Sequence, residues 1–408
     1  MKKHKFYLYP HIYFSKVDDG KLLLYSTISN LFIENNSPVC CELIDEIYKP
    51  ENLGVIDLTD KFLNNRIVTD FINQIVEQNF GKLIDFKPNM PKLINLLPIL
   101  NLQDDIDRLK QDQERDIGEN ALNYLNELNI YLNNQCNLDC SYCDCYYKQT
   151  KSCYKDIKNA YFQPDKIKEI LDSLTYSSLK KINFLGGNLF LYPFLNELIE
   201  LLKEYNFDFH YWIHIENLSN NNPDFDQNKD IVVNFPVNIE LVKQYIGTHK
   251  DDKKSTYHFL IENDSQYNEV ESIVKATGID NYQITPVYTG NNLSFFEENI
   301  YLEKEDIFAT LIPHRIIFCN QKLNSNHFGK LSILSDGDAK ANMNTPAIGN
   351  IYNNSILELI ATELNKNTAW RVIRDKKPCN QCLYQYLCPS PSSYETVIDK
   401  PNLCHVKA

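Results

Sequence analysis

The sequence has neither an excess of positive charge nor a long apolar run, and each absence excludes a class of protein. Its 408 residues include 41 basic and 54 acidic side chains, which gives a formal net charge of −13. Such a chain is poorly suited to nucleic acid or to an anionic membrane surface, and it contains no basic run interleaved with aromatic residues. We therefore expect neither nucleic acid nor a membrane among its partners. The length allows two or three domains and a substantial core.

Signals for export and membrane insertion are also missing. The most apolar stretch, residues 93–102, is too short to span a bilayer and contains a proline. The basic start at Lys2–Lys5 is followed by an aromatic, strand-like stretch with Pro10 inside it and without a small-residue cleavage site. These observations predict a cytoplasmic protein.

Cysteine, in contrast, is present twelve times. In a reducing compartment such residues are metal ligands more often than disulfides. Cys40 and Cys41 are adjacent in an apparent helix and are predicted to be buried small hydrophobic residues. Cys145 and Cys153 are predicted to be spare thiols.

Three further cysteines form the motif Cys136-x3-Cys140-x2-Cys143, directly after a predicted strand at residues 128–133. Iron–sulfur clusters are ordinarily held by four thiolates, so a three-cysteine site leaves one iron open to another ligand. Two alternatives are a coincidental spacing and a zinc site that lacks its fourth ligand. A second predicted strand, residues 181–185, leads into Gly-Gly-Asn188.

The cysteine motif and the glycine pair together resemble the radical SAM superfamily. The resemblance implies that Cys136, Cys140 and Cys143 hold a [4Fe-4S] cluster. In that family the open iron binds S-adenosylmethionine, which is reductively cleaved to a deoxyadenosyl radical. Tyr142 matches the aromatic residue that lies beside the adenine in the family.

Several other residues are predicted to contact S-adenosylmethionine. Glycines at positions 186 and 187 allow the backbone to approach the methionine end of the cofactor closely. The family usually has Gly-Gly-Glu-Pro, so Asn188 replaces a carboxylate with a neutral, weaker partner for the cofactor's ammonium. Asn234 and Asn263, near the ends of later strands, are further candidates, with turn or cap roles as the alternative.

Strands and helical patterns alternate through residues 121–305. Six strands with mostly helical crossovers predict an α/β fold with a parallel sheet, a partial (β/α)6 TIM-like barrel of radical SAM type. Chemistry in such sheets sits at the carboxyl ends of the strands. The predicted strands are 128–133, 181–185, 207–215, 231–237, 257–261 and 282–288, with helices at 166–174, 193–205 and 267–276.

Residues 1–88 are predicted to form a separate unit, with a hairpin of strands 6–14 and 21–25 and helices at 39–48 and 67–80. This order resembles the winged-helix RiPP recognition element, to which the leader of a precursor peptide adds as a strand. A purely structural domain is the alternative. Residues 89–120 are predicted to be a linker with a polar helix.

Residues 306–408 resemble the cysteine-rich SPASM extension of peptide- and sulfatase-maturing enzymes. The resemblance implies that one auxiliary [4Fe-4S] cluster is retained and a second is lost, because Cys319 has no partner where Asn342 and Ser392 replace cysteines. A four-thiolate zinc site is the alternative for the retained set. The retained ligands would be Cys379, Cys382, Cys388 and Cys404.

The resemblance is closest to the pseudo-radical-SAM/SPASM proteins of GG-Bacteroidales (double-glycine leader) peptide systems. It implies a radical SAM enzyme that modifies a ribosomally synthesised precursor peptide. The alternative is a catalytically degenerate protein that binds the leader as the partner of a second radical SAM maturase. A sulfatase-type maturase is disfavoured by the predicted peptide-binding unit.

Overall fold

The computed structural model describes residues 4–17, 20–85, 91–97, 121–141, 143–156, 160–218, 228–249 and 254–406. Tyr142 and the polar helix predicted before residue 121 lie outside these ranges.

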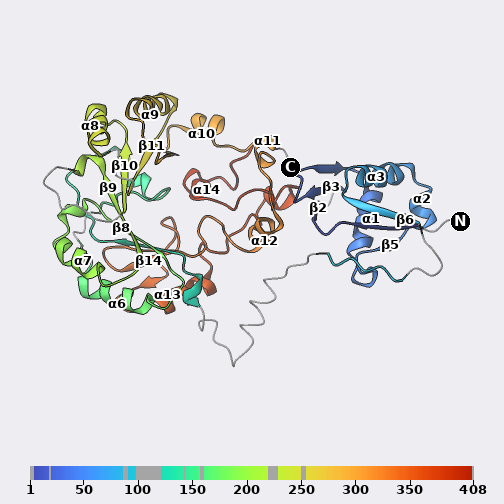
Figure 1. The fold of residues 1–408 in the computed structure, drawn as a ribbon, viewed down its shortest axis with the longest axis horizontal. Coiled ribbons are helices and arrows are strands. Elements are labelled where there is room, and N and C mark those ends of the chain that lie inside the picture. The colour runs from blue at the N-terminus through green and yellow to red at the C-terminus, as the bar shows by residue number, and fades with distance from the viewer. Residues whose placement is uncertain are drawn as a thin grey trace.

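A nine-stranded sheet with the order β12-β11-β10-β9-β8-β7-β13-β14-β15 forms the larger part of the molecule (Figure 1). The pairs from β12 to β13 are parallel, and the pairs of β14 are antiparallel. The predicted α/β class and the parallel order of six strands are confirmed. The strands are β7 (Glu127–Tyr131), β8 (Lys181–Leu185), β9 (Asp208–His214), β10 (Asn228–Asn234), β11 (Ser255–Ile261), β12 (Tyr282–Pro286), β13 (Lys330–Ile333), β14 (Asp338–Lys340) and β15 (Gly349–Asn350).

Helices connect most of the parallel strands, and one of them, between β10 and β11, was not predicted. None of the helices within the described ranges has the length and apolar character needed to cross a membrane. The helices after residue 120 are α5 (Cys143–Tyr146), α6 (Pro164–Leu174), α7 (Leu195–Leu202), α8 (Ile239–His249), α9 (Asp264–Thr277), α10 (Leu293–Asn299), α11 (Lys304–Ile307), α12 (His314–Lys322), α13 (Ile356–Lys366) and α14 (Ser393–Ile398), with short 3-10 turns η2 (Ala121–Tyr124), η3 (Leu189–Leu191), η4 (Ile215–Asn217) and η5 (Cys379–Gln381).

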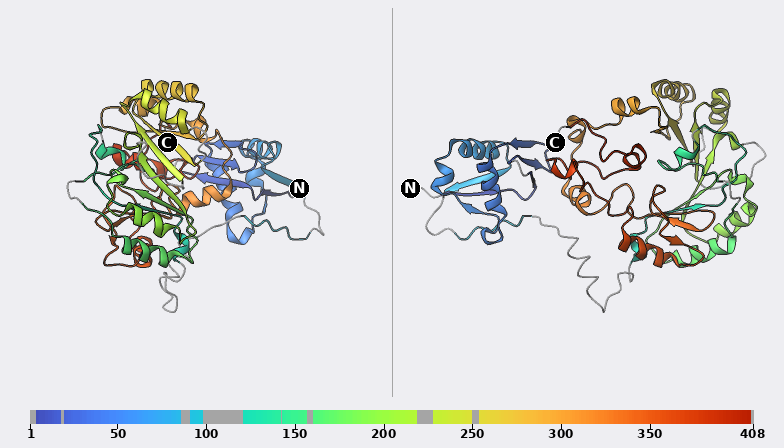
Figure 2. Two further views of the ribbon diagram at one scale, coloured as in Figure 1. Left: turned by 60° about the vertical axis from the view of Figure 1, so that its left-hand side comes forward. Right: turned by 180° about the vertical axis from the view of Figure 1, so that it is seen from behind.

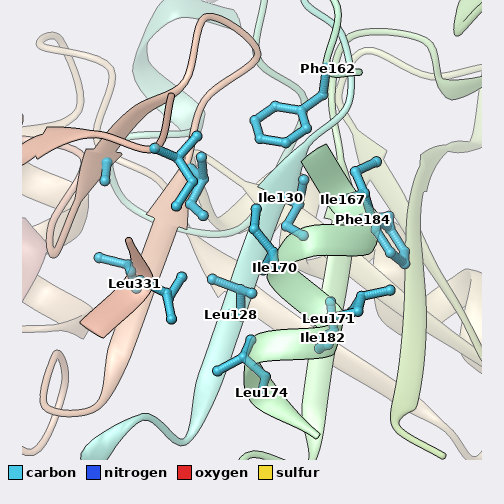
Figure 3. Close-up of a cluster of buried hydrophobic side chains, with 14 of the residues drawn as sticks. Leu128, Ile130, Phe162, Ile167, Ile170, Leu171, Leu174, Ile182, Phe184 and Leu331 are labelled. Atoms are coloured by element: carbon cyan, nitrogen blue, oxygen red, sulfur yellow. The ribbon is translucent and has the colours of Figure 1, made fainter. Parts of the chain in front are cut away.

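The two faces of this sheet differ in chemistry because successive side chains of a strand point to opposite sides. Leu128 of β7 and Ile182 of β8 lie on the face that packs against α6, in the main apolar cluster (Figure 3). Asn129 and Asn183 lie on the other face, where the Asn183 amide donates to Asn129 at 2.7 Å. The helices therefore cover an apolar face, and the opposite or inner face carries polar side chains together with a smaller buried apolar cluster that includes Tyr131, Leu185 and Val232.

The sheet continues beyond residue 305 into the cysteine-rich segment. β13 pairs in parallel with β7, and a turn at Gly337, which has φ +90°, leads back into β14. A sequence reading cannot find this pairing, because β7 and β13 are about 200 residues apart in the chain.

The N-terminal unit contains two three-stranded sheets, with orders β5-β1-β6 and β2-β3-β4. The single strand predicted at residues 6–14 is wrong. The chain turns at Pro10, where the Ile12 amide donates to the Tyr9 carbonyl at 3.0 Å, and the two halves join different sheets. The elements are β1 (His4–Leu8), β2 (Ile12–Lys16), β3 (Leu22–Ser26), β4 (Phe32–Asn35), β5 (Ile56–Asp57), β6 (Gly81–Asp85), α1 (Pro38–Tyr48), α2 (Asp60–Leu63), α3 (Arg66–Glu77) and η1 (Pro50–Asn52).

The helices predicted at 39–48 and 67–80 correspond to α1 and α3, and Cys40 and Cys41 are buried in the core between them, as predicted.

The sheet β2-β3-β4 packs against the C-terminal cysteine-rich segment, as both views in Figure 2 show. Tyr13, Leu23 and Tyr25 form one buried apolar cluster with residues of α11, α12 and the segment after η5. The buried Tyr25 hydroxyl accepts the Ile312 amide at 2.7 Å. The N-terminal unit is thus attached to the part of the chain that carries the last four cysteines.

Candidate metal centres

The three motif cysteines line one pocket at the carboxyl ends of the parallel strands. The loop that follows β7 carries Cys136 and Cys140, and Cys143 begins α5. All three are partly buried. The residues lining this pocket are Cys136, Leu138, Cys140, Cys143, Tyr146, Ser152, Cys153, His214, Val232 and Asn234.

The pKa values of these thiols are shifted by burial and by the neighbouring cysteines. Burial raises the pKa of Cys143 to about 11, and the neighbouring thiolates of Cys140 and Cys136 add to the rise. Burial also raises the pKa of Cys140, against the opposing effect of a hydrogen bond with Asn234. Metals bind the thiolate form, so a metal group at this site would displace protons that the apoprotein retains at neutral pH.

The two glycines after β8 hold the cysteine loop in place. A Cβ on Gly186 would lie 2.6 Å from Asn133 Oδ1, and one on Gly187 would overlap the Gln135 carbonyl oxygen. The Gly187 amide donates to Asn133 Oδ1 at 3.0 Å, and the Asn188 amide donates to the Gln135 carbonyl at 2.6 Å. The glycines therefore permit a close approach to the loop just before Cys136, an approach to protein that the sequence reading did not foresee.

Asn188 lies beside this junction, with its side chain engaged locally. Its Oδ1 accepts the Phe190 amide at 3.0 Å and so caps η3, and its backbone carbonyl accepts from Asn133 Nδ2 at 2.8 Å. An asparagine at this position thus satisfies the backbone of the following turn.

Of the two asparagines predicted from later strands, one reaches the pocket. Asn234, the last residue of β10, lines it and hydrogen-bonds the buried His214. Burial lowers the pKa of His214, so this ring is neutral at physiological pH. Asn263 instead caps α9 by accepting the Gln266 amide at 3.0 Å.

The sequence reading missed several residues of this pocket, among them Cys153 and Ser152. Cys153 was predicted to be a spare thiol, yet it lines the same pocket as the motif cysteines. Ser152 is 2% exposed, and its hydroxyl has no hydrogen-bond partner among the described residues. The sequence did contain a hint of this, because Cys153 follows Cys143 by only ten residues. That spacing alone did not indicate a role for Cys153.

A second pocket collects the last four cysteines. Cys379, Cys382, Cys388 and Cys404 line it together with Arg374. The Arg374 guanidinium lies 3.9 Å from Cys379 Sγ and pairs with the buried Glu395 carboxylate at 2.7 Å. Burial raises the pKa of Cys388 to about 12, and the positive charge of Arg374 opposes this rise. The site thus pairs four thiols with one buried cation.

The positions that the resemblance marks as lost ligands carry hydrogen bonds. Asn342 Nδ2 lies 3.0 Å from His327 Nε2. Ser392 caps α14 by accepting the Tyr394 amide at 3.2 Å, and its hydroxyl donates to Glu395 at 2.6 Å. Asn342 and His327 line a cavity of about 230 Å³ together with Glu127 and other polar residues of the sheet's inner face.

A charged network that the sequence reading also missed crosses the inner face. Asp230 of β10 accepts from His210 at 2.6 Å and from His258 at 2.7 Å. Burial alone raises the pKa of Asp230, but the two histidines hold it well below its usual value. The ring of Trp212 packs 4.4 Å from that of His258. This carboxylate is therefore ionised, and it binds β9, β10 and β11 together.

No group of three or more His, Cys, Asp or Glu residues within the described ranges is arranged to hold a metal ion. The two pockets are candidate metal centres because of the cysteines that line them.

Residues 130–260 match the family model of the Radical SAM superfamily. Over these residues the chain is similar to that family. The matched range includes the cysteine motif, the glycine pair, the strands β8 to β10 and every residue that lines the first pocket. No curated protein matches the chain significantly.

Solved structures give a distant likeness. Streptococcus suis SuiB bound to the precursor peptide SuiA is 13% identical, with 100% of this chain and 99% of that chain covered and a TM-score of 0.43. The tagged anSMEcpe with bound AdoMet is 14% identical, with 65% and 84% covered and a TM-score of 0.42. At these values the likeness carries no argument about activity.

Replacing Gly187 with alanine is expected to displace the cysteine loop, because the new Cβ meets the Gln135 carbonyl. We expect a lower melting temperature and faster alkylation of Cys136 and Cys140. Gly247→Ala is the matched control, since nothing lies within 4 Å of its Cβ position and alanine favours a helix by about 1 kcal/mol. Equal behaviour of the two variants would contradict the close approach.

Proposed function

We propose that the protein modifies a ribosomally synthesised precursor peptide by radical SAM chemistry. The observation that carries the proposal is the pocket in which Cys136, Cys140 and Cys143 meet at the carboxyl ends of the strands of a radical SAM domain. Parallel α/β sheets place their chemistry at this edge.

The residues of this pocket have separate roles in the proposal. The three motif cysteines hold a [4Fe-4S] cluster, and Ser152 offers a buried hydroxyl to it. Bound S-adenosylmethionine supplies the radical that abstracts hydrogen from the substrate. Gly186, Gly187, Asn188 and Asn234 position that cofactor, and the contact with its adenine is assigned to Tyr142, which is not among the described residues.

The C-terminal pocket would hold one auxiliary [4Fe-4S] cluster in this proposal. Its ligands are Cys379, Cys382, Cys388 and Cys404, which all line one pocket. Four thiolates bring negative charge into a partly buried site, and the Arg374 guanidinium offsets it. The inner auxiliary site is absent because hydrogen-bonding residues occupy two of its positions.

The N-terminal unit would bind the leader of the precursor. An extended peptide adds to an open sheet edge, and β6 is the terminal strand of the sheet β5-β1-β6. We assign leader binding to residues 1–88, a linker to 89–120, the radical SAM core to 121–305 and a SPASM-like domain to 306–408.

A second candidate function is favoured by Asn188. Its Oδ1 is already used by the Phe190 amide, and asparagine brings no negative charge for the cofactor's ammonium. A protein with this residue would bind the leader without turning over S-adenosylmethionine, as the partner of a second maturase.

The two complete ligand sets predict about eight irons in anaerobically reconstituted protein. Alanine at Cys136, Cys140 and Cys143 should leave about four irons per chain. Elemental analysis measures iron and zinc, and a separate assay measures acid-labile sulfide. Alanine at Cys40, a buried core cysteine, is the control and should leave the iron content unchanged. Zinc in place of the second set would overturn the auxiliary cluster, and twelve irons would overturn the loss of the inner one.

Asn188→Glu is expected to tighten binding of S-adenosylmethionine by roughly ten- to a hundredfold, because a charge-assisted hydrogen bond contributes about 1.5–3 kcal/mol. Asn188→Asp is the matched variant, since it keeps an acceptor for the Phe190 amide. Equilibrium dialysis measures binding, and deoxyadenosine release under strong reduction measures turnover. Release by the parent with peptide supports the enzyme. If the parent protein releases no deoxyadenosine at saturating cofactor, the non-catalytic leader-binding function is favoured.

Leader binding should slow amide hydrogen exchange along an edge strand of the N-terminal sheets in the full-length protein. The reason is that β-addition pairs the outer amides of the edge with the peptide backbone. Mass spectrometry locates the protection, and a leader of scrambled sequence is the control. Protection confined to β7 through β12 would place recognition in the radical SAM domain instead.

A further inference from the structure

The wall of the first pocket contains a fourth thiol. Cys153 lines the pocket together with all three motif cysteines. Its neighbour Tyr154 donates its backbone amide to the Gly186 carbonyl at 2.9 Å. The Tyr154 ring also packs edge-on against Tyr131, with the ring centres 5.7 Å apart. The segment is therefore attached to the glycine turn, and Cys153 has a fixed place in the wall.

A second observation at the same wall points to a ligand. The Ser152 side chain is 2% exposed, and its Oγ has no hydrogen-bond partner within the described ranges. A buried hydroxyl without a partner is unfavourable, because it has given up its hydrogen bonds to water. An anionic sulfur cluster in this pocket would accept that hydrogen bond. Ser152 and Cys153 thus present a hydroxyl donor and a thiol to the same pocket.

We propose that Cys153 provides a fourth thiolate to the cluster of Cys136, Cys140 and Cys143, so that S-adenosylmethionine must displace a protein ligand to bind. The proposal rests on the proposed function, because it requires a cluster at the motif. In the ligation step the thiol proton passes to solvent and one sulfur–iron bond forms. No electron is transferred.

The neighbouring Cys145 provides a matched control. It lies closer to the motif in sequence, but its Sγ lies 3.7 Å from Asp144 Oδ1, and it is not among the residues that line the pocket. Only Cys153 should therefore affect the cluster, although both residues are non-motif cysteines of the same segment.

The test uses full-length protein, reconstituted anaerobically and then oxidised with ferricyanide in the absence of S-adenosylmethionine. A cubane held by three thiolates loses its open iron on oxidation and gives a three-iron cluster visible by electron paramagnetic resonance. A cubane with four thiolates keeps all its irons. We expect about eight irons and no three-iron signal for the parent and Cys145→Ala, and about seven irons with the signal for Cys153→Ala.

A three-iron signal of equal yield in the parent and in Cys153→Ala would overturn the proposal. Failure of the proposed function is a different outcome: the parent would contain about four irons, and alanine at the three motif cysteines would not change that number.

A second measurement does not depend on the folding of a variant. Iodoacetamide should leave Cys153 unmodified in the loaded parent and modify it after iron is removed with a chelator, as peptide mass spectrometry reports. Equal modification in both states would overturn the proposal. Binding of S-adenosylmethionine should be about tenfold tighter in Cys153→Ala than in the parent, with Cys145→Ala unchanged.

Discussion

The close approach of two loops at the ends of β7 and β8 is the constraint on which the candidate site depends. Gly186 and Gly187 lie against Asn133 and Gln135 at distances that no side chain permits. Two backbone hydrogen bonds and the Asn133 side chain close this contact. Because the chain reaches Cys136 directly afterwards, the position of the whole cysteine loop follows from the junction. Tyr154 bonds to the same turn and brings Cys153 to the pocket.

The two faces of the sheet support this junction in different ways. The outer face is apolar and packs on α6, which fixes the strands relative to each other (Figure 3). The inner face combines a smaller apolar cluster around Trp212 with paired polar groups, such as Asp230 between two histidines. Buried charges of this kind are tolerated when every lone pair has a partner. The pocket therefore lies at the edge of a rigid framework.

The sequence predicted those features that depend on local pattern. Period-two strands and intervening helices were sufficient for the six parallel strands, and the cysteine spacing for the motif pocket. Features that depend on distant contacts were not found, such as β13 beside β7 and the Asp230 network. The break at Pro10 was missed because aromatic and apolar residues continue on both sides of it. Only the turn in which the Ile12 amide donates to the Tyr9 carbonyl shows that the chain passes there from one sheet to another.

Ser392 and Asn188, which depart from the pattern that the resemblance implies, both make local hydrogen bonds in this chain. Ser392 caps α14 and donates to Glu395, Glu395 pairs with Arg374, and Arg374 faces Cys379. Ser392 thus helps to orient the cation beside the four C-terminal cysteines. Asn188 likewise caps η3 beside the glycine junction. Restoring a family ligand at either position would therefore remove a cap worth about 1 kcal/mol. That loss falls on the folding stability of the chain and not on its affinity for a cofactor, because the cap would be missing from the free and the bound protein alike.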